Sequence, residues 1–318
     1  MLLPGMWVEV LPASEIAGTL DAEQCLGSLP FMPEMLPYCG RRFRVALRAE
    51  RTCVHPPEIP FRRLEGAVVL EGLRCDGSLH GDCQLGCMLF WKEGWLRRVP
   101  ANEGGQATGT LVAGTVSVPE MRATRRSDPG RYFCQATALR RATTPGEPLC
   151  RPGQYLRFLR VRTYAVPELL AMLIRTGSRR FARLLRPKAR DAFDTKTQLT
   201  ASLGLQAGEW VEVRSRAQIL QTLDARRTYE GFSFGGDMYD QCGRRMRVSR
   251  RVDRLMDEET GKLRAVPDTV ILEGSVCDRY FGCARQIPFQ WKELWLKRAE
   301  TVPSAPDIAA GTKRRLGS

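Results

Sequence analysis

The chain has 318 residues, a formal net charge of +14, eleven cysteines and two histidines, a length that suits two or three small domains. It opens without a basic segment, a long apolar run or a small-residue cleavage pattern, so we expect neither a secretory signal nor a spanning helix. An odd number of cysteines in such a chain favours reduced thiols or metal ligands in a cytoplasmic protein over a disulfide scaffold.

A duplication is the most informative feature of the sequence. Residues 7–98 recur as residues 210–298, and both copies contain WVEV, TLD and CGRR in the same order. Trp7 aligns with Trp210 and Cys39 aligns with Cys242 without an insertion or deletion between them. Gaps are needed only in the loops further along the chain. Chance similarity would not keep register over this length, so we predict a duplicated domain.

Short strands are predicted within each copy. In the first copy, residues 7–10, 41–48, 66–74 and 90–99 alternate apolar with polar residues or are rich in Val, Phe and Trp, as β-strands are. About ninety residues with five or so such strands predict a mainly β fold of two small SH3-like β-barrels, joined by an irregular and partly helical basic segment.

Two finer expectations concern both copies. A short helix is predicted at residues 13–20 and again at residues 216–223, with Ser14 and Ser215 as N-caps. The Lys-Glu pair beside the tryptophans recurs, and we expect it to form a structural ion pair in each copy: Lys92 with Glu93, and Lys292 with Glu293.

The soft and borderline metal ligands are distributed unevenly between the copies. Cys75 and Cys83 have counterparts in the second copy, whereas Cys53 aligns with Met256 and Cys87 with Ile287. Both histidines of the chain lie in the first copy, close to these cysteines. The candidate metal ligands are Cys53, Cys75, Cys83 and Cys87, with His55 and His80 as additional ligands or as residues that support them.

These residue types suit tetrahedral zinc, and a set of cysteines alone also suits an iron–sulfur cluster, so the metal is undecided at this point. Glycines at positions 77, 81 and 86 would let the loop take positive φ angles and fold tightly around an ion. Disulfides and inert buried thiols are the alternatives. A cysteine nucleophile with His80 as its base is a further alternative.

The segment between the copies, residues 101–205, carries most of the positive charge. Residues 101–200 contain 18 Lys and Arg against 7 Asp and Glu. We expect residues 131–145, which include Cys134, to be irregular, and residues 167–185 to form a helix with an apolar face. Its opposite face would present arginines to nucleic acid or to an acidic partner, namely Arg175, Arg179, Arg183 and Arg186.

Three phrases carry a resemblance: LPFMPEMLPYCGRRFRV, LRCDGSLHGDCQLGCMLFWKE and YFCQATALRRATTP. They resemble an uncharacterised family of bacterial proteins that has no function to transfer, and they span most of residues 7–145. The tandem barrels are also similar to KOW-type nucleic-acid-binding modules in their size and opening strand. Because the second copy departs from the Cys-rich pattern, a metal site implied by the resemblance belongs to the first copy.

The sequence therefore predicts four regions: residues 1–100 with the Cys/His cluster, residues 101–205, residues 206–300 as a degenerate copy, and a disordered tail at 301–318. The leading hypothesis is a cytoplasmic metal-binding accessory protein, with zinc or an iron–sulfur cluster in the first copy and a protein partner. The alternatives are a nucleic-acid-binding protein that uses the Arg-rich middle segment and a metal- or thiolate-dependent enzyme. No P-loop, G-x-G-x-x-G, G-x-S-x-G or H-E-x-x-H motif is present.

Overall fold

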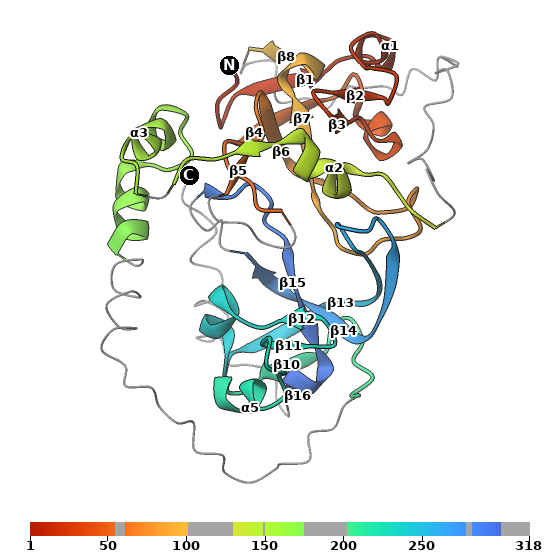
Figure 1. Cartoon of the computed structure of the whole chain (residues 1–318), viewed down its shortest axis with the longest axis vertical. Coiled ribbons are helices and arrows are strands. Elements are labelled where there is room, and N and C mark those ends of the chain that lie inside the picture. The colour runs from red at the N-terminus through yellow and green to blue at the C-terminus, as the bar shows by residue number, and fades with distance from the viewer. Residues whose placement is uncertain (55–60, 101–129, 149, 175–201, 278–281, 300–318) are drawn as a thin grey trace. The chain divides into compact units, whose positions relative to one another are not determined.

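The computed structural model of the chain describes residues 1–54, 61–100, 130–148, 150–174, 202–277 and 282–299. The described part is mainly β, as the sequence predicts, and it includes a sheet curled into a half-barrel. Its residues group into two compact units (Figure 1). Unit 1 contains Met1–Leu185, Met256–Arg264 and Arg279–Gln286, and unit 2 contains Arg186–Leu255, Ala265–Asp278 and Ile287–Ser318.

A five-stranded antiparallel sheet forms the body of unit 1. Its strand order is β7 (Met88–Lys92), β6 (Ala67–Arg74), β4 (Arg42–Arg48), β1 (Trp7–Val10) and β8 (Leu96–Val99). The alternation in WVEV places Val8 and Val10 in the core, because successive side chains of a strand point to opposite faces. All five residues of β7 are buried.

The second copy repeats this strand order. Its sheet runs β15 (Pro288–Lys292), β14 (Leu263–Val276), β13 (Arg245–Met256), β10 (Trp210–Val213) and β16 (Leu296–Arg298). The register repeats as well, since Trp7 lies opposite Arg44 and Trp210 lies opposite Arg247. The duplication inferred from the sequence is therefore visible in both strand order and strand register.

The remaining elements are short. Three two-stranded pairings are β2 (Cys25–Leu26) with β3 (Leu29–Pro30), β11 (Thr228–Tyr229) with β12 (Phe232–Ser233), and β5 (Arg62–Arg63) with β9 (Thr144–Pro145). The α-helices are α1 (Ala13–Ala17), α2 (Gln135–Ala142), α3 (Gly153–Arg160) and α5 (Arg216–Leu220), and residues 166–174 are also helical. Turns of 3₁₀ helix occupy Pro33–Tyr38, Glu93–Trp95, Gly236–Gln241 and Glu293–Trp295.

The helix predictions are partly confirmed. Ser215 is the N-cap of α5 and accepts a hydrogen bond from the Gln218 backbone N–H. Ser14, however, is not a cap, because α1 begins one residue earlier, after Pro12, and has no side-chain cap. The segment 131–145, which we expected to be irregular, contains α2, whose Ala, Leu, Gln and Arg residues favour a helix.

The closing strand expected at residues 90–99 is divided in two by the Glu93–Trp95 turn. The expected Lys92–Glu93 ion pair is absent: Lys92 Nζ donates to the Glu65 carbonyl at 2.8 Å, and Glu93 pairs with Arg48. In the second copy, Lys292 pairs with Glu230 at 2.5 Å and Glu293 with Arg251 at 2.6 Å. The turn separates adjacent side chains, so each binds a different neighbour.

The core of each copy is built around two tryptophans. Trp91 and Trp95 are fully buried, and the Phe31 ring meets them edge-on with centroids at 6.1 and 5.2 Å. Phe234 packs on Trp291 and Trp295 at 6.3 and 5.5 Å. Within the described residues, no helix is long and apolar enough to cross a membrane.

Candidate metal centre

The loop that joins β6 to β7 carries four of the sequence-predicted ligands, Cys75, His80, Cys83 and Cys87. A backbone hydrogen bond from Cys75 N–H to the Cys87 carbonyl, 2.8 Å long, closes its base. Gly77, Gly81 and Gly86 have φ angles of +75°, +76° and +67°, which confirms the conformation expected for them. A Cβ at Gly77 would lie 2.0 Å from the Cys83 carbonyl oxygen, so only glycine allows the loop to close this tightly.

His80 lies between a carboxylate and a thiol. Its Nδ1 is 2.7 Å from Glu34 Oε1, and its Nε2 is 3.7 Å from Cys75 Sγ. The possible ligand atoms of Glu34, Cys75 and His80 all lie within 4.8 Å of one another. When Nδ1–H donates to the carboxylate, Nε2 presents its lone pair to the thiol side, as in histidine metal ligands held by a second residue.

The surroundings of His80 favour positive charge. Burial alone lowers the pKa of His80, but hydrogen bonds with Cys75, Cys83 and Glu34 outweigh it and raise the pKa far above its usual range. The site therefore favours a positive charge beside the thiols. A bound metal ion would supply positive charge in the same place, because an ion displaces protons from its ligands.

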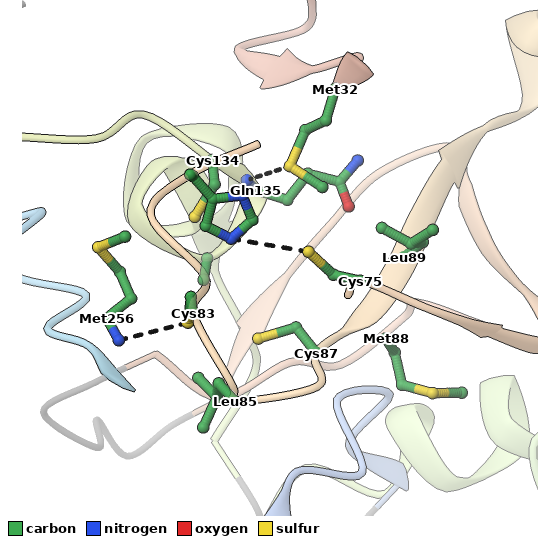
Figure 2. Close-up of a pocket in the computed structure, with 12 residues that line it drawn as sticks. Met32, Cys75, Cys83, Leu85, Cys87, Met88, Leu89, Cys134, Gln135 and Met256 are labelled. Carbon is green, nitrogen blue, oxygen red and sulfur yellow. Dashed lines mark hydrogen bonds between the residues drawn. The ribbon is translucent and has the colours of Figure 1, made fainter. Parts of the chain in front are cut away.

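Sulfur atoms line the pocket next to His80. Figure 2 shows the side chains of Cys75, Cys83 and Cys87 around one space. The cavity measures about 20 Å³, which is enough for one water-sized species. The sulfur-bearing residues that line it are Met32, Cys75, Cys83, Cys87, Met88, Cys134 and Met256.

Cys134 comes from outside the duplicated copy and was not among the sequence-predicted ligands. It precedes α2, and Gln135, the first residue of that helix, is anchored to the edge strand β7. The Gln135 Nε2 donates to the Phe90 carbonyl at 2.8 Å, and its Oε1 accepts from the Phe90 N–H at 2.8 Å. The side chain thus replaces a neighbouring strand at this edge and holds Cys134 beside the loop.

Burial raises the pKa of Cys134 and of Cys87, but the charged groups near the two thiols differ. For Cys134 the largest opposing influence is the charge of His80, which lowers its pKa. For Cys87 it is Arg285. Both thiols line the same pocket, with His80 acting on the pKa of Cys134 and Arg285 on that of Cys87.

The other sequence-predicted residues are placed elsewhere or lie outside the described part. Cys53 is not among the residues that line this pocket, and its Sγ lies 3.5 Å from that of Cys283. His55 and the four arginines of the predicted nucleic-acid face lie outside the described residues, as do the tail at 301–318 and most of the expected helix 167–185.

The second copy keeps the hydrogen bond at the base of the loop and has Cys277 and Cys283 where the first copy has Cys75 and Cys83, but it has no histidine there. Cys277 N–H donates to the Ile287 carbonyl at 3.0 Å, so Ile287 occupies the register position of Cys87. Asp237 stands where the first copy has Glu34. No family model matches the chain, and neither a curated protein nor a solved structure matches it.

Proposed function

We propose that this protein is a metal-binding protein that holds one zinc ion in its first copy. The proposed ligands are Cys75 and His80 together with Cys83 and Cys134 of the same pocket lining. Glu34 orients the imidazole through its Nδ1. Cys83 and Cys134 lie outside the group of ligand atoms within 4.8 Å of one another and would move toward the ion on binding. The observation that carries the proposal is the Glu34–His80–Cys75 arrangement, with atom separations of 2.7 and 3.7 Å. Carboxylate, imidazole and thiol follow one another in the order that a zinc site with a supporting carboxylate requires.

The separation of His80 Nε2 from Cys75 Sγ supports a shared tetrahedral ion. Zn–N bonds of about 2.0–2.1 Å and Zn–S bonds of about 2.3 Å, at a tetrahedral angle, put the two ligand atoms about 3.6 Å apart. The structure has 3.7 Å. The two atoms can therefore bind one ion with almost no movement.

Two observations favour a single ion over an iron–sulfur cluster. The cavity of about 20 Å³ has room for one atom-sized species, whereas a cluster also brings inorganic sulfide. An imidazole supported by a carboxylate is an ordinary zinc ligand, whereas clusters are held mainly by thiolates. A site closed by four protein ligands, without an open position, is structural in zinc proteins.

The proposed role is therefore that of a binding protein whose metal centre fastens α2 to the first copy, in keeping with an accessory protein that docks on a partner. We also assign each curled sheet to an SH3-like barrel. The shared strand order and the closing 3₁₀ turn support this finer assignment.

Elemental analysis of anaerobically purified full-length protein, with sulfide assay and absorption spectrum, tests the proposal. We expect about one zinc per chain and a colourless protein. Cobalt in place of zinc should give the thiolate-to-metal absorption of a tetrahedral site. A brown protein that contains iron and sulfide would show that the site holds an iron–sulfur cluster instead of zinc. A protein that contains no metal after purification and binds none in a zinc titration would overturn the proposal.

Single serine variants identify the fourth ligand. Cys134→Ser should lose the metal, whereas Cys87→Ser and Cys53→Ser should keep it. If Cys87→Ser loses the metal and Cys134→Ser keeps it, the protein still binds zinc, but the fourth ligand is Cys87 of the loop. Loss in the Cys53→Ser variant would return that residue to the ligand set.

A further inference from the structure

A second pair of sulfur atoms lies in unit 1, apart from the proposed ligands. Cys53 follows β4 of the first copy, and Cys283 lies in the loop between β14 and β15 of the second copy, in a segment that belongs to unit 1. Their Sγ atoms are 3.5 Å apart, and the Cys53 N–H donates to Cys283 Sγ at 3.3 Å. Cys53 is half-buried, while Cys283 is 2% exposed.

The backbone around the pair is held from several sides. Ala284 N–H donates to the Arg51 carbonyl at 2.9 Å, and Arg285 Nη1 reaches the Cys53 carbonyl at 3.5 Å. The Arg285 guanidinium also binds both carboxylate oxygens of Glu258, at 2.8 and 2.5 Å. These contacts fix the residues on either side of both sulfurs, so little chain freedom remains to be lost when the sulfurs join.

A matching contact elsewhere in unit 1 shows what is particular to this pair. Met256 N–H donates to Cys83 Sγ at 3.4 Å, and Met256 aligns with Cys53 as Cys83 aligns with Cys283. The same contact between a backbone N–H and a sulfur thus occurs twice. The donor to Cys83 is Met256, which has no thiol, so Cys83 cannot form a disulfide there and stays available as a metal ligand. The donor to Cys283 is Cys53, so in that contact two thiols face each other.

We propose that Cys53 and Cys283 are a site of reversible disulfide formation, with low-molecular-weight disulfides such as oxidised glutathione as the reacting class. Both sulfurs must approach from 3.5 Å to a bond of about 2.05 Å, a movement within reach of side-chain rotation. The bond would covalently fix segment 282–286 of the second copy to the segment that follows β4 of the first.

The reaction is a pair of thiol–disulfide exchanges. Cys53, the more exposed thiol, loses its proton to solvent, and its thiolate attacks one sulfur of oxidised glutathione and expels one glutathione thiolate. Cys283 then loses its proton and attacks the Cys53 sulfur of the mixed disulfide, which expels the second glutathione. The protein loses two electrons and two protons, and one oxidised glutathione becomes two reduced molecules. The hydrogen bond with Cys283 and burial raise the pKa of Cys53, so we expect the exchange to take hours at neutral pH.

The test uses the full, metal-loaded chain in glutathione buffers of increasing oxidised fraction, followed by acid quenching, maleimide alkylation and tryptic mass spectrometry. Cleavage gives residues 52–62 and 280–285, each with a single cysteine. We expect these two peptides to be linked in most chains at high oxidised glutathione, with the link reversed by dithiothreitol and zinc content unchanged. The Cys283→Ser variant should instead accumulate glutathione on Cys53, and Cys150→Ser, which removes an exposed thiol, should form the same link as the parent chain.

Three results would overturn the proposal. The peptides could remain separately alkylated, or Cys53 could stop at the glutathione adduct in the parent chain. Cys53 could also link mainly to another cysteine, such as Cys87. Loss of zinc in the Cys53→Ser or Cys283→Ser variant would assign the pair to metal binding instead.

Discussion

The two copies share a sheet and differ in one loop, and this difference separates scaffold from site. Both copies have the same strand order, and both end on a pair of buried tryptophans that pack on a phenylalanine. Only the first copy combines a histidine, a supporting glutamate and a cysteine before α2 around its loop. The sheet is therefore the shared scaffold. Cys75 and Cys83 also have counterparts in the second copy, so His80, Glu34 and Cys134 are what set the site of the first copy apart.

The largest contrast is expected between the equivalent loop cysteines. Cys83→Ser should lower zinc affinity by more than about 100-fold, beyond the 10–100-fold effect of losing a supporting residue, because it removes a ligand. Cys283→Ser should leave zinc content at the parent level. Competition with a chelator measures both affinities, and equal losses would show that the loops contribute alike.

A stability contrast is expected at the glutamates of the two 3₁₀ turns. Glu293 is fully buried and accepts N–H groups of Gly204 and Leu205 at 2.7 and 3.0 Å, as well as Arg251. Glu93, whose side chain is 28% exposed, binds Leu2 N–H and Arg48. Glu293→Gln should cost about 3 kcal/mol and Glu93→Gln about 1 kcal/mol in urea unfolding. Similar losses of stability in the two variants would mean that the deeper burial of Glu293 does not make its contacts more stabilising than those of Glu93.

The supporting carboxylate gives a smaller, site-specific contrast. Glu34→Gln should weaken zinc binding by about 10–100-fold, since the amide binds Nδ1–H less strongly than a carboxylate does. Asp237→Asn, at the equivalent position, should not change it. If isothermal titration with zinc finds the two variants equal to the parent, Glu34 does not support a metal ligand.

The smallest contrast concerns the first tryptophan of each pair. Trp291 Nε1 donates to Ser275 Oγ at 2.7 Å, whereas Trp91 Nε1 has no hydrogen-bond partner among the described residues. Trp291→Phe should therefore destabilise the protein by about 1 kcal/mol more than Trp91→Phe, because only the former breaks a buried hydrogen bond. Thermal unfolding of the two variants tests this, and a greater loss for Trp91→Phe would contradict it.

Much of the scaffold was predictable because it repeats. Alternation in WVEV and the Val-rich run before Cys75 indicate strands, and the second occurrence of each motif confirms the reading. The break at Glu93–Trp95 was missed, since the aromatic and charged residues on either side also suit one continuous strand. Helix α2 was missed because its short sequence has no start signal stronger than a cysteine.

The site was only partly predictable for a different reason. Cys75, Cys83, Cys87 and His80 lie close in sequence, so their spacing indicated one loop. Cys134 is brought to them by the Gln135 side chain on the edge of β7, which no spacing rule describes. Cys53 was grouped with the ligands because it is a thiol that the second copy lacks, but its sulfur faces Cys283 across 230 residues of sequence.

The anchoring of α2 by Gln135 has a consequence for how the protein is made. The sheet of the first copy is complete once Val99 has left the ribosome, but the proposed centre has only three of its ligands until Cys134 follows. At about 5–20 residues per second, this leaves a delay of a few seconds. During this time the nascent first copy would present an incomplete thiol site that holds zinc weakly and is open to competing soft metals.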